Sequence, residues 1–184
     1  MARKSINELI AQANADFPDN VTGLITPADL RQFCLDFLNA IAPAYGYLSA
    51  VGPLTQVFNI APSVLSFDTA YDSDPSQTTS NATNDSVSRA ERGTSTINFS
   101  VDVALANNVA LTFTIHKQGA ATPWRITAVG RGAANPVSVA LTAIDYADPA
   151  AVYTVQAVAE TNGTSVEITN AVFAVAVDPV KSFT

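Results

Sequence analysis

The chain has 184 residues, enough for one sizeable core or for a small helical module followed by a β domain, and too few for two large domains. Charged residues make up only 14% of it, against about 25% in a typical soluble domain. Its formal net charge of −7 would repel phosphate backbones, which argues against nucleic-acid binding.

Two helices are predicted first. Ser5 and Glu8 have the spacing of a capping box, so a helix is expected over about residues 5–15. In the second helix Thr26 can cap, Pro27 suits the first helical position, and Pro43 ends the helix. Such short helices are marginal alone in water, so the apolar stripe of the second helix must be buried against its neighbour, the β domain or a partner chain. That stripe comprises Leu30, Phe33, Cys34, Phe37, Leu38 and Ile41.

The start of the chain predicts neither a signal peptide nor a membrane span. Arg3 and Lys4 are followed by a stretch that Asn7 and Glu8 interrupt, and no apolar run approaches the length that crosses a bilayer. Cys34 is the only cysteine, so intrachain disulfides are excluded. We therefore expect a protein made in a cytoplasm, without membrane insertion.

The rest of the chain predicts β-structure. Residues 54–67 favour a strand, and residues 68–96, almost free of large apolar side chains, are expected to form a long exposed polar loop. From Thr96 onward apolar and polar residues alternate, with turns at Asn107 and Asn108 and, as a tight type I′ hairpin, at Asn162 and Gly163.

About seven or eight strands at regular spacing predict a mainly β fold, an antiparallel β-sandwich of jelly-roll type preceded by a short two-helix segment. The expected organisation is a helical attachment segment over residues 1–48 and a β-sandwich domain over residues 49–184, which includes the polar loop 68–96.

The outward positions of the expected strands are small and neutral. Between Gly132 and Val177 the only charged residues are two aspartates and two glutamates, and the outward residues are Ala, Thr, Ser, Asn and Gln. Such faces suit a surface covered by another subunit, and a neutral surface exposed to water is the alternative.

Candidate chemical sites are few. His116, the only histidine, has no second histidine or cysteine partner nearby in sequence, and Cys34 is expected to be a small core residue. Asp68, Asp72 and Asp74 could offer oxygens to calcium but lack EF-hand spacing, so a solvated acidic loop is favoured. Aromatic side chains could form a sugar-stacking platform, although core or interface positions are the commoner use; these are Trp124, Tyr45, Tyr47, Tyr71, Tyr146 and Tyr153. We predict no catalytic residue, no metal and no cofactor.

The front stretch INELIAQANADFPDNVTGLITPADLRQFCLDFLNAI resembles a segment near the N-termini of tailed-bacteriophage structural proteins, where a short helix, a PDN…TG turn and an ITPADLR helix precede fibre or decoration modules. The match covers about residues 5–48 and implies an attachment segment. The rear part is similar in pattern to the jelly-roll heads of phage fibre and cement proteins and of tumour-necrosis-factor-like trimers. No long repetitive shaft separates the two parts, which favours a decoration protein or short knob.

These patterns support three hypotheses. The first is a non-enzymatic virion structural protein of a tailed phage, made in the bacterial cytoplasm: a homotrimeric capsid decoration or short fibre protein that attaches to capsid or tail proteins. Its attachment face would comprise Leu30, Phe33, Phe37, Leu38 and Ile41. The second is a receptor- or glycan-binding head that contacts a host surface glycan through Tyr71, Asp72 and Asp74. The third, a depolymerase, would need paired carboxylates in a cleft.

Overall fold

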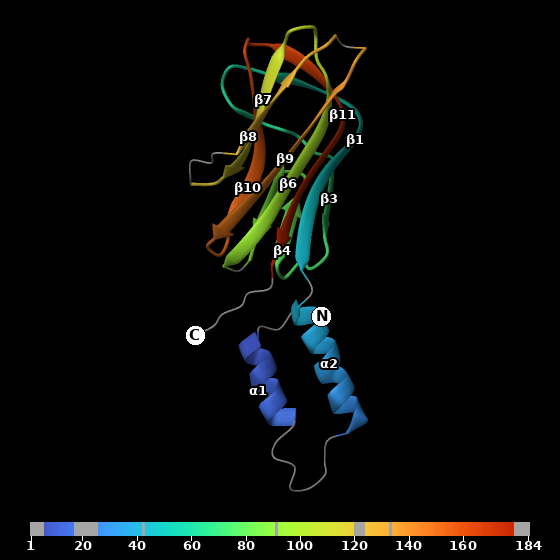
Figure 1. Ribbon diagram of the computed structural model, residues 1–184, viewed down its shortest axis with the longest axis vertical. Coiled ribbons are helices and arrows are strands. Elements are labelled where there is room, and N and C mark those ends of the chain that lie inside the picture. The colour runs from blue at the N-terminus through green and yellow to red at the C-terminus, as the bar shows by residue number, and fades with distance from the viewer. Residues whose placement is uncertain are drawn as a thin grey trace.

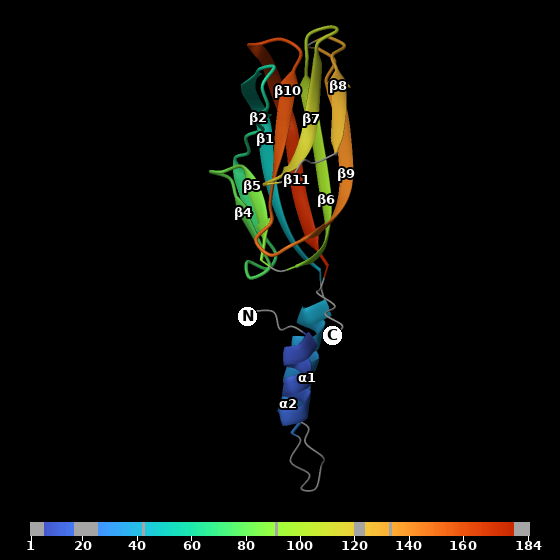
Figure 2. The ribbon, with the colours of Figure 1, turned by 90° about the vertical axis from the view of Figure 1, so that its left-hand side faces the viewer.

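The computed structural model describes residues 6–16, 26–41, 43–90, 92–119, 124–132 and 134–178. Two helices lie beyond one end of a β-sandwich made of two antiparallel sheets (Figure 1). Seen from the side, the second helix continues along the long axis of the sandwich (Figure 2). The predicted class, a jelly-roll-like antiparallel sandwich preceded by two short helices, is confirmed.

The helices are α1 (Ile6–Asp16) and α2 (Pro27–Ile41). The backbone N–H and the hydroxyl of Thr26 donate to Asp29 Oδ2 at 3.0 and 2.7 Å, and the Asp29 N–H donates back to Thr26 Oγ1 at 3.2 Å. This reciprocal cap confirms the predicted start of α2 and lowers the pKa of the Asp29 carboxyl, first through the Thr26 side chain and then through its backbone. The predicted cap of α1 at Ser5 lies outside the described residues.

The first sheet has five strands, in the spatial order β3-β1-β11-β6-β9. It is built from one short edge strand and four long ones: β3 (Thr69–Asp72), β1 (Ala44–Phe58), β11 (Thr164–Val177), β6 (Gly93–Ala104) and β9 (Val137–Ala147).

The second sheet has the order β4-β5-β10-β7-β8, with β2 (Ser63–Val64) also paired to β10. Its other strands are β4 (Thr78–Asn81), β5 (Ser86–Arg89), β10 (Val152–Ala159), β7 (Ala110–Lys117) and β8 (Arg125–Val129).

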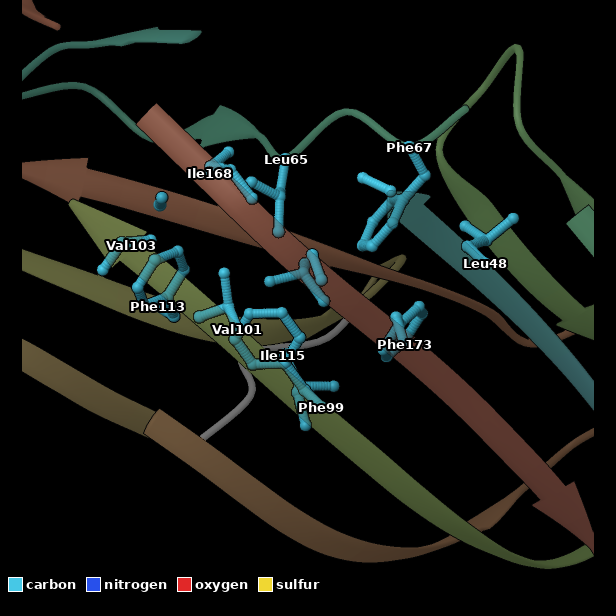
Figure 3. Close-up of a cluster of buried hydrophobic side chains, with 14 of the residues drawn as sticks. Leu48, Leu65, Phe67, Phe99, Val101, Val103, Phe113, Ile115, Ile168 and Phe173 are labelled. Carbon is cyan, nitrogen blue, oxygen red and sulfur yellow. The ribbon is translucent and has the colours of Figure 1, made fainter. Parts of the chain in front are cut away.

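The core lies between the two sheets and follows the predicted alternation. In β6 and β7 the apolar residues of odd number point inward and are fully or almost fully buried, as expected for strands with one covered face. Aromatic rings fill the middle: Phe99 packs on Phe113 with centroids 5.3 Å apart, and Phe67 stacks on Phe173 at 6.3 Å (Figure 3).

The first strand starts earlier than the sequence pattern predicts. β1 begins at Ala44, so residues 44–48, assigned above to the helical segment, belong to the sandwich. Its inward residues include Ala44, Gly46 and Ala50, and its outward residues include Tyr45 and Tyr47. Leu48 also points into the core, but the larger tyrosines face away from it, against the usual hydrophobic pattern.

The long polar loop expected over residues 68–96 is wrong. This stretch contains β3, β4, β5 and the start of β6, and its backbone is paired with β1 and β10. Side chains complete the pairing of the turns: Asp85 Oδ1 accepts from Phe67 N at 2.7 Å, and Asn81 Oδ1 accepts from the backbone N–H groups of Thr83 and Asn84. Short polar side chains thus stabilise strands that few large apolar residues support.

The chain enters and leaves the sandwich at the same end, since Ala44 pairs with Val177. The opposite end carries the connection from β10 to β11, which the sequence predicted as a two-residue type I′ turn. It is instead a four-residue connection, 160–163, in which only Gly163 has a positive φ, of 75°. The side chains of Asn59 and Asn162 tie it to the end of β1 by accepting from Gly163 N and Ile60 N.

Candidate functional site

The outer face of the five-stranded sheet is the most distinctive surface of the molecule. Among the described residues, six of the nine exposed large apolar side chains outside the helices lie on it: Tyr45, Val51, Val57, Tyr71, Ile144 and Tyr146. Only Val64 and Val129 of the remaining three lie within strands of the second sheet. The two faces of the sandwich therefore differ sharply in apolar exposure.

Most side chains at the centre of this face are small and uncharged. One row of paired residues crosses all five strands, from Tyr71 and Tyr47 through Ala174 to Asn98 and Thr142. The Thr142 hydroxyl donates to Asn98 Oδ1 at 2.9 Å, which satisfies both groups within the sheet. Of the outward residues of the five strands, only Asp102 and Glu167 are charged, and both are acidic.

We call this surface the neutral face. Small side chains let another backbone approach closely, and apolar rims at both edges would gain by leaving water. Contiguous apolar surface on a soluble domain commonly marks an interaction site. The arrangement can therefore bind a second protein surface of the same character.

Three tyrosines gather at one edge of the neutral face. The Tyr71 ring lies 5.4 Å from the Tyr47 ring and 6.1 Å from the Tyr45 ring, between centroids. Tyr71 belongs to β3 and not to a loop, because it pairs with Tyr47 in the neighbouring strand. Of the six aromatic residues considered for sugar stacking, these three come together. Tyr153 is buried in the core, and Tyr146 lies on β9 at the opposite edge of the sheet.

The acidic residues of the expected receptor loop are engaged with their own chain. Asp72 accepts from the backbone N–H of Ser80 at 2.9 Å and from its hydroxyl at 2.8 Å, which links β3 to β4. Asp74 accepts from the backbone N–H and hydroxyl of Ser76, and Asp68 accepts from the Thr69 hydroxyl. Within the described residues no group of three or more His, Cys, Asp or Glu side chains comes together.

The predicted attachment face of α2 is largely exposed. Leu30, Phe37 and Leu38 are 53%, 47% and 58% exposed, and Phe33 is half-buried. The side chain of Ile41 is outside the described ones. Cys34, expected in a core, is exposed, because α2 does not turn this stripe toward α1. Neither α1 nor α2 has the length and apolar character that crossing a bilayer requires, and these are the helices of the described chain.

A shallow polar groove of about 430 Å³ lies on the other side of the sandwich, over β4, β5 and β10. Its lining consists of hydroxyl and amide side chains and one valine: Thr79, Asn81, Asn84, Ser86, Ser88, Gln118, Val152 and Thr154. None of these is charged. The next residue along one row is His116, which pairs with Thr154 and is half-buried. The groove was not predicted, because its strands come from distant parts of the sequence.

A buried polar network joins the two sheets near the end that faces the helices. Tyr153 donates to Asp145 Oδ2 at 2.7 Å, and Lys117 Nζ lies 2.9 Å from the same oxygen. Burial, followed by the bond to Asp145, raises the pKa of Tyr153, so its hydroxyl stays protonated. Arg89 Nη1 donates to Ser95 Oγ at 2.7 Å and to the Gly93 carbonyl. These contacts connect strands of opposite sheets and stabilise the packing of the two sheets.

No protein-family model matches the chain, and no curated protein does. Solved structures similar to it include murine APRIL at pH 8.0, with a TM-score of 0.54 and 9% identity over 74% of this chain and 99% of that one. Eiger TNF from S. frugiperda has a TM-score of 0.54 and 11% identity, over 77% and 96%. The globular domain of the zebrafish complement 1qA protein has a TM-score of 0.52 and 10% identity, over 73% and 95%. At these identities the likeness shows the fold: the β domain is a jelly-roll sandwich like theirs.

Proposed function

We propose that the chain is a non-enzymatic structural protein of a tailed-bacteriophage virion, a homotrimeric capsid decoration or short fibre protein made in the bacterial cytoplasm. One observation carries the trimer: the neutral face, with two charged residues on five strands and six exposed large apolar side chains. Three sandwiches packed around an axis would cover these faces, and about 800 Å² per partner suffices for a stable interface. The jelly-roll fold and the resemblance to tumour-necrosis-factor-like trimers support the same assembly.

The virion assignment rests on the resemblance of residues 5–48 to the front segment of phage structural proteins. The position of the helices beyond one end of the sandwich supports it, because an arm there can reach a capsid or tail protein while the sandwiches stay free (Figure 1). Immunogold labelling of intact particles with an antibody against this chain tests the assignment. Particles that assemble without any label contradict it.

The trimer is tested by placing a charge on the neutral face. Ile144 is 67% exposed on β9, so Ile144→Lys leaves the core intact yet buries an unpaired ammonium group in the interface. We expect sedimentation at micromolar concentration to report a trimer for the unaltered chain and mostly monomer for Ile144→Lys. The matched control is Val129→Lys, 52% exposed on β8 of the other sheet, which should remain trimeric. A monomeric unaltered chain overturns the proposal.

A second candidate function, glycan binding, is favoured by the polar groove. Hydroxyl and amide side chains without charge match the hydrogen-bonding groups of a neutral sugar, and Val152 offers a small apolar patch. If this function holds, Thr79→Trp should fill the groove and abolish adsorption to host cells while the particles stay stable. Val129→Trp, an exposed position on the outer side of the same sheet, is the control. Particles that lose stability with unchanged adsorption favour the decoration role.

A further inference from the structure

Helix α2 packs on α1 through its less apolar side. Asp36 is 5% exposed and Phe33 is half-buried, while Leu9 of α1 is also buried. Leu30, Cys34 and Phe37 lie away from Asp36 on the helix circumference and remain exposed. The hairpin of α1 and α2 thus leaves the most apolar side of α2 uncovered, and that side needs a partner.

The spacing of the uncovered residues identifies the kind of partner. Leu30, Cys34, Phe37 and Ile41 are separated by four, three and four residues, which is the d-a-d-a pattern of a heptad repeat. The flanking positions Phe33 and Leu38 are also apolar. A heptad seam is self-complementary, because knobs of one helix fill the holes of an identical parallel helix. The apolar flanks widen the seam, which suits three helices better than two.

The connection to the sandwich brings the same helices together. Only residues 42 and 43 separate α2 from β1, an inner strand of the sheet whose outer side is the neutral face. If three neutral faces meet around an axis, the C-terminal ends of the three copies of α2 lie close to that axis. The side view shows α2 extended along the strand direction, as a helix parallel to the axis requires (Figure 2).

We propose that α2 from three copies of this chain forms a parallel three-helix bundle, with Leu30, Cys34 and Phe37 in its core. The inference rests on the proposed homotrimer, because a 15-residue helix associates too weakly alone and needs the sandwiches to raise its effective concentration. Contact with other virion proteins then falls to the outside of the bundle, where Ile10 of α1 is exposed.

The bundle places the single cysteine of each chain opposite its counterparts, and this makes it testable. The full-length protein is treated with a short bismaleimide at micromolar concentration and run on a denaturing gel. We expect a covalent dimer that accounts for at most two of every three chains, since each chain has one thiol. The control is the double variant Cys34→Ser/Leu35→Cys. It moves the thiol about 100° around the helix to a position that is 48% exposed, where cross-linking should be slight.

A second pair of variants measures how much the proposed helix bundle contributes to the stability of the trimer. Phe37→Asp puts a carboxylate into the proposed core, so the trimer should dissociate at a concentration at least about tenfold higher. Leu35→Asp adds the same charge outside it and should leave the dissociation unchanged. If sedimentation reports a trimer but the thiol at position 34 cross-links no better than the thiol at position 35, the bundle is overturned and the proposed trimer stands. A monomeric unaltered chain overturns both.

Discussion

Asp85 shows how a single side chain holds together a stretch that has little apolar support. Its carboxylate accepts from the Phe67 N–H, which fixes a core residue at the edge of the sandwich, and its own φ is 50°. Burial raises the pKa of Asp85, and the hydrogen bonds from the Phe67 backbone and the Ser66 side chain oppose that rise. The charged Asp85 carboxylate therefore lowers the stability of the fold slightly, because its hydrogen bonds do not fully offset the loss of hydration.

Asp85→Asn should remove the free-energy cost of keeping a charged carboxylate partly buried. The amide keeps an acceptor for Phe67 N and tolerates a positive φ, but carries no charge. Because the folded-state pKa of Asp85 lies above its unfolded value, the stability that it contributes is complete below the unfolded pKa and is lost as pH rises through the folded one. In urea at pH 7 the free energy of unfolding of Asp85→Asn should exceed that of the unaltered chain by up to about 1 kcal/mol, after allowance for the partial exposure of this side chain.

The pH dependence supplies the control for this variant. The difference between Asp85→Asn and the unaltered chain should shrink toward zero below about pH 4, where the aspartate is protonated in both states. A difference that stays constant from low to neutral pH would mean that the substitution acts through packing and not through charge. Both chains are compared at one protein concentration, because association contributes to apparent stability.

Residue types predicted the cap of α2 well and the environment of Cys34 badly. Thr26, Pro27 and Asp29 act through local backbone geometry, so their pattern is readable in a single stretch. The helical period of the stripe around Cys34 was identified correctly, but a period states only that a side is apolar. Which surface covers that side depends on chain topology and on partners, and these are absent from the local pattern.

At the scale of strands, Gly46 lets β3 and β4 approach β1. A Cβ at this position would lie 2.5 Å from Asp72 Oδ1 and from Ser80 Oγ, the two groups whose hydrogen bond joins β3 to β4. Gly130 is tighter, since its Cβ would lie 2.0 Å from the backbone carbonyl oxygen of Ala106. Side-chain ends can shift, whereas a paired backbone cannot.

Substitution by alanine should rank these two sites. Gly46→Ala is expected to lower the free energy of unfolding by about 1–3 kcal/mol, through overpacking and loss of the Asp72–Ser80 contact. Gly130→Ala is expected to cost more, because the chain must move near Ala106. Chemical unfolding of the two variants side by side measures the order, and a larger loss at Gly46 would contradict this account.

Strands were predicted where large apolar residues alternate and missed where they do not. The alternation of Ile97, Phe99 and Val101 marks β6 plainly, since burial of one side of a strand has a period of two. β3, β4 and β5 rely on threonine, serine and side-chain-to-backbone bonds, with Val87 as their fully buried anchor. In the first part of β1 Ala44 and Gly46 face the core and the tyrosines face outward, so hydrophobic size gives the wrong orientation for these residues.

At the scale of the whole molecule, the proposed trimer should respond to salt in an unusual direction. The neutral face has only two charged residues, both acidic, on a chain of net charge −7, so attraction between charges contributes nothing to its association. Raising sodium chloride to about 1 M shortens the Debye length to about 3 Å and screens the mutual repulsion. Sedimentation should show a dissociation constant that is unchanged or lower in high salt. Dissociation at high salt would point to an interface elsewhere, built on ion pairs.

The neutral composition of the strand exteriors was evident from the sequence, but their grouping was not. Tyr45 and Ile144 lie far apart in the sequence and come to the same face of one sheet only through the strand order β3-β1-β11-β6-β9. The polar groove is a similar case, because Asn84 and Gln118 are distant in the sequence and line the same groove only in the folded sandwich. Such surfaces follow from long-range pairing, which no local pattern specifies.

Ala44, the first residue of β1, pairs with Val177, the last residue of β11, so the sandwich begins and ends on one side. The 160–163 connection lies at the opposite tip (Figure 1). A foreign peptide grafted into that tip would project away from the helices and from the sheet that we expect to be covered. If the proposed trimer forms, the molecule would display grafted epitopes in sets of three, provided that the hydrogen bonds accepted by Asn59 and Asn162, which hold the tip, are preserved.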